Sequence, residues 1–369
     1  MLINQIISAC MAFGVLLGGI DAVLGNRFGF GSRFEQGFRL LGPIALSMAG
    51  IICMTPTLST ILEVTLVPVL KLIHMDPGIF GGLLAIDMGG YSLAAELALD
   101  ARMRDFSGII LAATFGCTLV FVIPVGLGTI RTDDQPHFTK GILLGFLSLP
   151  AAILVGGLLC DLTLGEILWN TLPILLLCVS LFVGILKYPQ KMTRLFLRFA
   201  AGIRILAMVG LTLAAFTHIS GIALIKNMPP LMDAMKTVSG ICIVMLGSMP
   251  LAELLQRLLR MPFEGIQKHT GLNAVSTTAL ILGMVSVTPS LAMIPDMDKR
   301  GKVVCSSWLV CSAAAFGAHL GFAMSTREDM LGAMLAAKLA GGILGAAIAF
   351  LATRNMHEAK SGKDIETSL

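Results

Sequence analysis

The sequence predicts an all-α polytopic membrane protein. Only 13% of its 369 residues are charged and 56% are hydrophobic, with a mean hydropathy of +0.88, whereas a soluble domain carries about 25% charged residues. So apolar a chain has too little polar surface to cover a globule in water. The net charge of +4 is small, and in a membrane protein such a balance indicates basic cytoplasmic loops rather than nucleic-acid binding.

Apolar segments follow one another along the whole chain. A helix needs about 20 apolar residues to cross a bilayer, and eleven segments approach that length. They cover 2–24, 38–56, 78–99, 106–129, 141–160, 165–186, 197–224, 237–256, 271–294, 303–324 and 330–353. No basic residue precedes Arg27, so we expect the first segment to remain as a span rather than to be cleaved as a signal peptide. The polar tail, 354–369, is predicted to be a disordered cytoplasmic segment.

Two of the segments are interrupted near their middle. Segment 78–99 contains the carboxylate of Asp87 followed by "MGG", and segment 271–294 contains "LGMVSVTPSL". Glycine lets the backbone unwind, and proline removes a helical hydrogen bond. We therefore predict a broken or re-entrant helix at each place.

The two interrupted segments are related by a shift of the chain. Moving the sequence by 194 or 195 residues places 78–99 on 271–294, Pro56 on Pro250 and the first span on 197–224. Recurrence of one shift predicts two structural repeats, 1–160 and 197–353, joined by a linking transmembrane helix within 161–196. Internal repeats of this kind are common in secondary transporters.

The distribution of basic residues favours re-entrant hairpins over eleven full spans. If all eleven segments cross, Lys and Arg divide almost evenly between the two sides. If the two interrupted segments are hairpins, most of the basic loops face the cytoplasm, as the positive-inside rule expects. The predicted layout is then nine spans and two hairpins, with the N-terminus outside, the C-terminus inside and the two repeats inverted.

No catalytic motif is present. The sequence contains no Walker A loop, no G-x-S-x-G and no H-E-x-x-H. Its eight cysteines form no C-x-x-C pair, so neither a metal site nor a bound cofactor is expected. The pattern favours a transporter over an enzyme.

Ionisable groups inside membrane segments are the best candidates for a binding site, because each costs about 2.5–3.5 kcal/mol on insertion scales. Asp87 lies in an interrupted segment, where transporters bind their substrates. Tyr91 follows by one helical turn, and an aromatic face beside a carboxylate suits an ammonium group. A structural role stays open for both, as a cap of a half-helix for Asp87 and as packing for Tyr91.

Three further residues have two open interpretations each. Glu96 is either a second site acid or, as we favour, part of an interfacial ion pair with Arg102 or Arg104. Glu253 is either a site acid or the polar end of a helix. His319, in "GAHLGF", is either a buried structural histidine or a ligand of the substrate.

Several motifs resemble the bacterial ethanolamine utilisation permeases. They are "FEQGFRLLGPIALSMAGI" (34–51), "LLAIDMGGYSLAAELA" (83–98), "MDKRGKVV" (297–304) and "HLGF" (319–322). The resemblance covers nearly the whole chain. It implies a secondary transporter that imports ethanolamine across the bacterial inner membrane to supply a cytoplasmic pathway.

The resemblance also assigns expected roles. A site for protonated ethanolamine needs a partner for the ammonium, for which Asp87 and Tyr91 are the candidates. Met88, Gly89 and Gly90, which lie between them, are further expected substrate-binding residues. The site needs a polar partner for the hydroxyl, for which Ser286, Thr288 and His319 are candidates, and Glu253 is a further site residue. The oligomeric state stays open, a homo-oligomer being one alternative.

The chain departs from the family pattern at three polar positions. It has "VSVTP" at 285–289, Ala318 before the histidine and Ala95 before the glutamate, where the family carries an A-N-N-I-P run, an acid and a lysine. A related small amine or diol therefore remains an alternative substrate. A channel-like facilitator of the same substrate is an alternative mechanism, and a subunit of a larger translocation complex is the rival class.

Overall fold

The computed structural model describes residues 2–83 and 90–354, and every regular element within these ranges is helical. The predicted all-α fold class is confirmed. The elements before residue 160 are α1 (Leu2–Val23), α2 (Phe30–Arg39), α3 (Leu41–Thr65), α4 (Val67–Leu72), α5 (Ile79–Leu83), α6 (Gly90–Leu97), α7 (Ala101–Asp105), the π-helical stretches η1 (Phe106–Gly116) and η2 (Thr118–Val122), α8 (Ile123–Thr129), α9 (Gln135–Phe146) and α10 (Leu149–Leu159).

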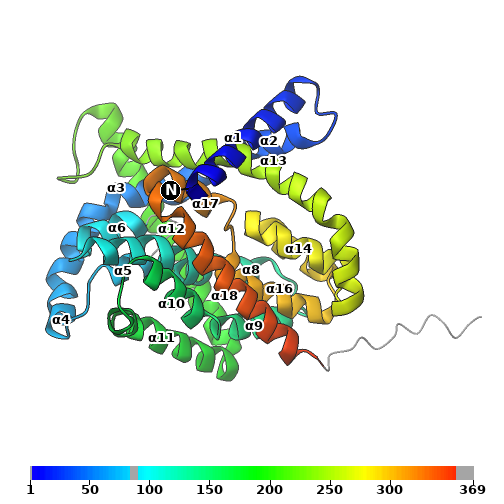
Figure 1. Cartoon of the computed structure of the whole chain (residues 1–369). Coiled ribbons are helices and arrows are strands. Elements are labelled where there is room, and N and C mark those ends of the chain that lie inside the picture. Colours follow the sequence, from blue (N-terminus) through cyan, green and yellow to red (C-terminus); the bar gives the residue numbers. More distant parts are fainter. Residues whose placement is uncertain (1, 84–89, 355–369) are drawn as a thin grey trace, which may run out of the picture.

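The rest of the chain begins with α11, in the segment that was predicted to link two repeats. The elements are α11 (Leu164–Lys187), α12 (Pro189–Ser220), α13 (Leu231–Thr270), α14 (Ala274–Val285), α15 (Val287–Ala292), η3 (Ile294–Asp296), α16 (Lys299–Ser312), α17 (Ala318–Thr326), η4 (Glu328–Met330) and α18 (Leu331–Ala352). Figure 1 shows α13 passing over the other helices and α18 crossing the front of the molecule.

Seven helical segments in the described ranges are long and apolar enough to cross a membrane. They are Asn4–Val23, Phe30–Thr65, Ala101–Thr129, Leu164–Lys187, Gln190–Ser220, Leu231–Leu258 and Glu328–Ala352. An eighth forms if α9 and α10, which meet at a bend of 41°, count as one span. The chain is therefore a multi-pass membrane protein, and eight of the nine predicted spans correspond to these segments.

The prediction of one continuous helix over 303–324 is wrong. The chain forms α16 up to Ser312, leaves the helix over 313–317 and resumes as α17 at Ala318. Ala314 has a left-handed backbone, with φ of 53°. The amides of Ala314 and Phe316 donate to carbonyls of α14 instead of to their own helix, which explains why the helix stops.

In each interrupted segment, the chain that enters and the chain that leaves are hydrogen-bonded to each other. At the first, the amide of Leu99 donates to Asp76 Oδ2 over 3.0 Å, so the chain before α5 meets the chain after α6. At the second, the amide of Asn273 donates to Asp298 Oδ1 over 3.0 Å, so the chain before α14 meets the start of α16. We call the contact between Asp76 and Leu99 base 1, and the contact between Asn273 and Asp298 base 2.

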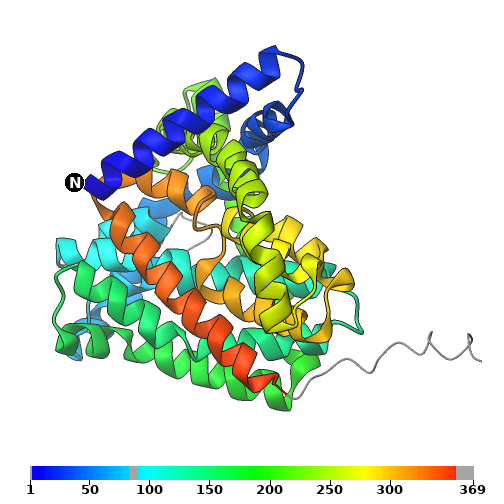
Figure 2. The same ribbon diagram turned by 45° about the vertical axis from the view of Figure 1, so that its right-hand side comes forward.

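Base 1 and base 2 lie at opposite ends of α18. Next to base 1, Asp105 pairs over 3.0 Å with Arg327, which precedes α18. Next to base 2, Arg300 Nη2 donates to the carbonyl of Phe350 in the last turn of α18, over 3.0 Å. A helix of 22 residues is about 33 Å long at 1.5 Å per residue, close to the thickness of the hydrocarbon core. Figure 2 shows α18 running from one side of the molecule to the other.

Two helix crossings depend on glycine. A Cβ added to Gly14 of α1 would lie 2.2 Å from the carbonyl oxygen of Gly247 in α13. A Cβ added to Gly210 of α12 would lie 2.2 Å from the carbonyl oxygen of Gly50 in α3. The backbones approach closely because no side chain separates them, as in other membrane helix pairs.

Candidate substrate site

A cavity of about 640 Å³ lies where the second interrupted segment meets the break in the following helix. Its walls come from α3, η2, α8, α12, α14–α15 and α17, and most of its lining side chains are hydrophobic. The described polar lining includes Ser47, Arg204, Ser286, Thr288 and His319. The structure therefore brings together three of the residues that were predicted for the site.

In the second interrupted segment, the helix is broken at Ser286. This residue has an extended backbone, with φ of −151° and ψ of 130°, between α14 and α15. The carbonyls of Gly283 and Met284, at the end of α14, accept from the amides of Ala314 and Phe316 over 2.8 and 2.7 Å. The carbonyls at the end of α14 thus bond to amides in the segment between α16 and α17. In this way, backbone groups that are not paired within a helix are hydrogen-bonded.

Gly317 makes this crossing of the two breaks possible. A Cβ at this position would lie 1.9 Å from the carbonyl oxygen of Val285. Because no other residue lacks a Cβ, the contact between the segment 313–317 and the end of α14 requires glycine here.

His319 has one bonded and one free ring nitrogen. The side chain is 1% exposed, and Nδ1 lies 3.1 Å from the carbonyl oxygen of Ala313. A carbonyl only accepts, so the hydrogen of a neutral imidazole is assigned to Nδ1. Nε2 is then an acceptor, and it has no hydrogen-bond partner among the described residues.

Ser286 and Thr288 add hydroxyl groups to the same wall. Ser286 is half-buried and Thr288 is exposed towards the cavity that both residues line. Each hydroxyl can donate one hydrogen bond and accept others. The wall can therefore recognise a small molecule that carries a hydroxyl or an ammonium group.

Two predicted site residues lie apart from the described lining of this cavity. Tyr91, on α6, packs edge-on against Phe322 with ring centroids 6.2 Å apart. Glu253 forms ion pairs of 3.0 Å with Arg33 and with Arg257. The ion pair with Arg33 joins α2 to α13, and the one with Arg257 lies within α13.

The other candidates of the first interrupted segment are only partly covered. Gly90 is buried and is the first residue of α6. Asp87, Met88 and Gly89 lie outside the described residues.

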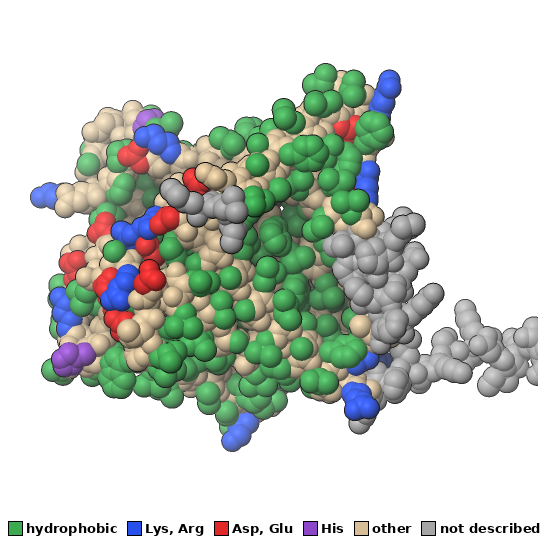
Figure 3. All heavy atoms as spheres, viewed as in Figure 1, with side chains coloured by type: hydrophobic (Ala, Val, Ile, Leu, Met, Phe, Trp, Pro, Cys, Tyr) green, Lys and Arg blue, Asp and Glu red, His purple; other side chains and the backbone are tan. Residues whose placement is uncertain are grey.

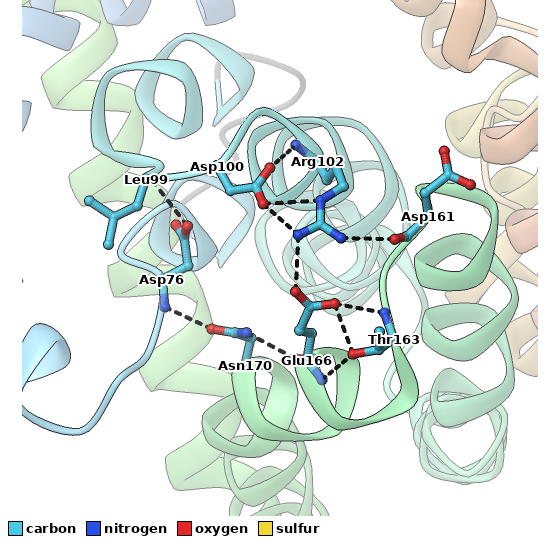
Figure 4. A network of polar contacts seen from close by, with 8 residues as sticks. All are labelled: Asp76, Leu99, Asp100, Arg102, Asp161, Thr163, Glu166 and Asn170. Carbon is cyan, nitrogen blue, oxygen red and sulfur yellow. Dashed lines mark hydrogen bonds and ion pairs between the residues drawn. The ribbon is translucent and has the colours of Figure 1, made fainter.

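A polar network holds base 1 against α11 (Figure 4). Arg102 pairs with Asp100 over 2.6 Å and with Glu166 over 3.0 Å. Asn170 of α11 accepts from the amide of Asp76 over 2.7 Å. The ion pair predicted between Glu96 and these arginines is wrong in its partner, because Glu96 accepts from a serine of α3 instead.

The pKa values of two carboxyls at or next to base 1 are shifted in opposite directions. The hydrogen-bonded guanidinium of Arg102 holds the pKa of the Asp100 carboxyl below its usual range. Burial raises the pKa of the Asp76 carboxyl, although backbone amides donate to it. Figure 3 shows charged side chains gathered towards the left edge of the view, on the side of α4, α5 and α6.

Lys338 is a buried ionisable residue that was not among those predicted for the site. This residue lies in the predicted span 330–353, is fully buried and donates to the carbonyl oxygen of Ala113 in η1. It lies close enough to His319 for an electrostatic interaction. A charged residue in an apolar segment marks a candidate functional site, and Lys338 meets this criterion as clearly as Asp87 does.

A second, smaller cavity of about 240 Å³ lies on the other side of the crossing. It is lined by Met11, Ser248 and Phe316, and Val285 contributes to both cavities. Among the residues that the structure describes, no group of three or more His, Cys, Asp or Glu could hold a metal ion.

Comparison with known proteins identifies the family. The model of the family described as "Ethanolamine utilisation protein, EutH" matches residues 3–352. The "Probable ethanolamine permease EutH" of Listeria monocytogenes serotype 1/2a is 35% identical over 363 residues, 98% of this chain and 97% of that protein. The "Uncharacterized protein YxeR" of Bacillus subtilis is 36% identical over the full length of both chains.

A third relative agrees with these two. The "Probable ethanolamine permease EutH" of Salmonella typhimurium is 32% identical over 388 residues, covering 95% of each chain. No solved structure is significantly similar to the chain. The Listeria and Salmonella relatives are named as probable permeases, which agrees with the expected class of transporter rather than enzyme. The motifs, the fold and these matches show that the chain belongs to the ethanolamine utilisation protein EutH family.

Proposed function

We propose that the protein is a secondary transporter that imports ethanolamine across the bacterial inner membrane. The observation that carries the proposal is the cavity of about 640 Å³ at the crossing of two helix breaks, with Ser286, Thr288 and His319 in its wall. Binding sites of secondary transporters lie at such interrupted helices. Three relatives that match nearly the whole chain are named probable ethanolamine permeases.

The chemistry of the cavity suits one end of the substrate. The hydroxyl of ethanolamine can donate to Nε2 of His319, which is a free acceptor, and can bond to the hydroxyls of Ser286 and Thr288. We assign the ammonium group to the carboxylate of Asp87, as the resemblance implies. Glu253 is left out of the site because two arginines already neutralise it.

We further propose that residues 1–160 and 197–353 are inverted repeats, that 161–196 links them and that 354–369 is a cytoplasmic tail. Base 1 and base 2 lie at opposite ends of α18, as two hairpins entering from opposite sides require. The glycine crossing of α1 with α13 has a counterpart in that of α12 with α3. The predicted shift of 194 or 195 residues places α1 on α12 and α3 on α13, so it maps one crossing onto the other.

A facilitator of the same substrate is the second candidate mechanism. The described residues that line the cavity include no Asp or Glu, so this part of the path offers no fixed negative charge to hold a cation. If Asp87 does not supply one, the path conducts its substrate without a tight site. A related amine or diol stays the alternative cargo, because the departures at 285–289 and 318 fall on the cavity wall.

The variant Asp87→Asn tests the assignment of the ammonium site. We expect it to abolish uptake of labelled ethanolamine by intact cells at near-neutral external pH, because the amide carries no charge to pair with the ammonium. The matched control is Glu96→Gln, which neutralises an exposed carboxylate on α6 and should leave uptake unchanged. Unchanged uptake by a normally expressed Asp87→Asn protein removes Asp87 from the site.

Competition identifies the cargo. Unlabelled choline, 1-amino-2-propanol, propanediol and ammonium would each be added to the same uptake assay. Competition by 1-amino-2-propanol but not by propanediol is the expected pattern, because both the amine and the hydroxyl are recognised. Stronger competition by propanediol than by ethanolamine itself would assign the protein to a diol.

A further inference from the structure

Lys338 is a cation inside the helix bundle. Its side chain is 0% exposed, and its ammonium group donates to the carbonyl oxygen of Ala113. None of the ion pairs between described residues includes it. An ammonium in such a position costs several kcal/mol unless its surroundings compensate, so its presence calls for an explanation.

The surroundings of Lys338 offset only part of this cost. Besides the carbonyl of Ala113, it has the thiols of Cys117 and Cys311 within electrostatic range. Cys311 lies in the last turn of α16, which ends at Ser312. The C-terminal end of a helix carries partial negative charge and favours a cation. These contacts hold the ammonium in place without cancelling its charge.

The charge of Lys338 acts on the large cavity. Its hydrogen-bond partner Ala113 lies four residues before Cys117, about one helical turn, and Cys117 lines that cavity. Arg204 of α12 lines the same cavity. The nine-residue helix α17 begins there with Ala318, so its positive end adds to the same field. Among the lining residues that the structure describes, none carries negative charge.

We propose that Lys338 is a specificity-determining residue that excludes bare cations, both protons and alkali ions, from the transport path. A fixed positive charge beside a pore raises the energy of a small cation. An amino alcohol differs because its hydroxyl bonds to His319, Ser286 or Thr288. The role of Lys338 rests on transport through this cavity, and it keeps the path closed to the ions whose gradients the membrane maintains.

Leak measurements on the purified full chain in liposomes test this role without any substrate. Proton entry is followed with an internal pH dye after a potassium diffusion potential is imposed, and potassium permeability is followed separately. Lys338→Met keeps an unbranched side chain only one atom shorter and removes the charge, and Lys338→Gln is a second neutral variant. We expect about tenfold faster leak in both, which corresponds to about 1.4 kcal/mol of lost barrier.

Two further variants separate charge from packing. Lys338→Arg keeps the positive charge and is expected to leak no more than the wild type. Lys302→Met removes another buried lysine, which is paired with Asp134 at 2.5 Å and does not line the cavity, and it should also stay tight. Neutral variants as tight as the wild type, a leaky wild type, or leak in Lys338→Arg equal to that in Lys338→Met would each overturn the proposal. Because ethanolamine is absent, none of these results depends on the proposed substrate.

Discussion

At the scale of single residues, His319 has a structural contact through one ring nitrogen and a proposed binding role for the other. The sequence offered these as alternatives, and the structure gives a separate ring nitrogen to each. Nδ1 contacts the carbonyl of Ala313, while Nε2 is unpartnered among the described residues. Which role a buried histidine has cannot be derived from its position in the sequence, because it depends on which acceptor the fold places beside each nitrogen.

Replacing this histidine tests the free nitrogen. His319→Phe should raise the KM for ethanolamine about two- to tenfold, because one hydrogen bond of about 0.5–1.5 kcal/mol is lost, while the aromatic volume is kept. His218→Phe, at an exposed position on α12, is the control and should leave the KM unchanged. The measurement is the concentration dependence of initial uptake, and an unaltered KM in a stable His319→Phe protein would remove the residue from the site.

Charged residues within the membrane were predictable from the sequence, but their partners were not. Asp87 and Lys338 are both ionisable groups in apolar runs. The partners of Glu96 and Glu253 were ambiguous because several arginines lie within a few turns of each. Tertiary packing selects Ser59 for the first and Arg33 for the second, whereas Arg257 is the local i,i+4 partner of Glu253 on α13.

At the scale of elements, the two interrupted segments were predictable and the broken helix α16–α17 was not. Glycine and proline mark the first two, whereas the run around 313–317 is apolar and has the composition of a helix. The break there is tertiary in origin, because amides of Ala314 and Phe316 bond to the end of α14. A left-handed alanine has no sequence signature.

Gly317→Ala tests the crossing of the two breaks. The added methyl would overlap the carbonyl of Val285, so the segments must move apart at a cost of about 1–3 kcal/mol. We expect a lower melting temperature in detergent together with loss of uptake.

The matched control for this prediction is Gly202→Ala. Gly202 lies within α12 and has no neighbour within 4 Å of an added Cβ, so this change should stabilise the helix slightly, by about 1 kcal/mol at most. A Gly317→Ala protein as stable and active as the Gly202→Ala protein would show that the crossing is not required.

At the scale of the whole molecule, the placement of the two hairpins decides the topology. The sequence predicts two hairpins from the balance of basic loops. The proposal that they enter from opposite sides is supported by α18, whose two ends contact base 1 and base 2. No local pattern encodes these contacts, because Arg327 and Arg300 reach residues that lie far away in the chain.

Labelling of single cysteines tests this topology. In a Cys10→Ser background, which removes the only exposed native thiol among those described, Leu99→Cys reports on base 1 and Lys299→Cys on base 2. Both side chains are exposed. A membrane-impermeant maleimide added to intact cells should modify the first and not the second. Modification of both, or of neither before the cells are opened, contradicts the inverted arrangement.

The most direct test of the central claim is uptake of labelled ethanolamine by the purified chain in liposomes. If this chain alone forms the transport path, uptake will be saturable, will exceed that of protein-free liposomes and will fall when His319 is replaced by Phe. Uptake no greater than in protein-free liposomes, from protein shown to be folded and inserted, would contradict the account and favour a subunit of a larger complex.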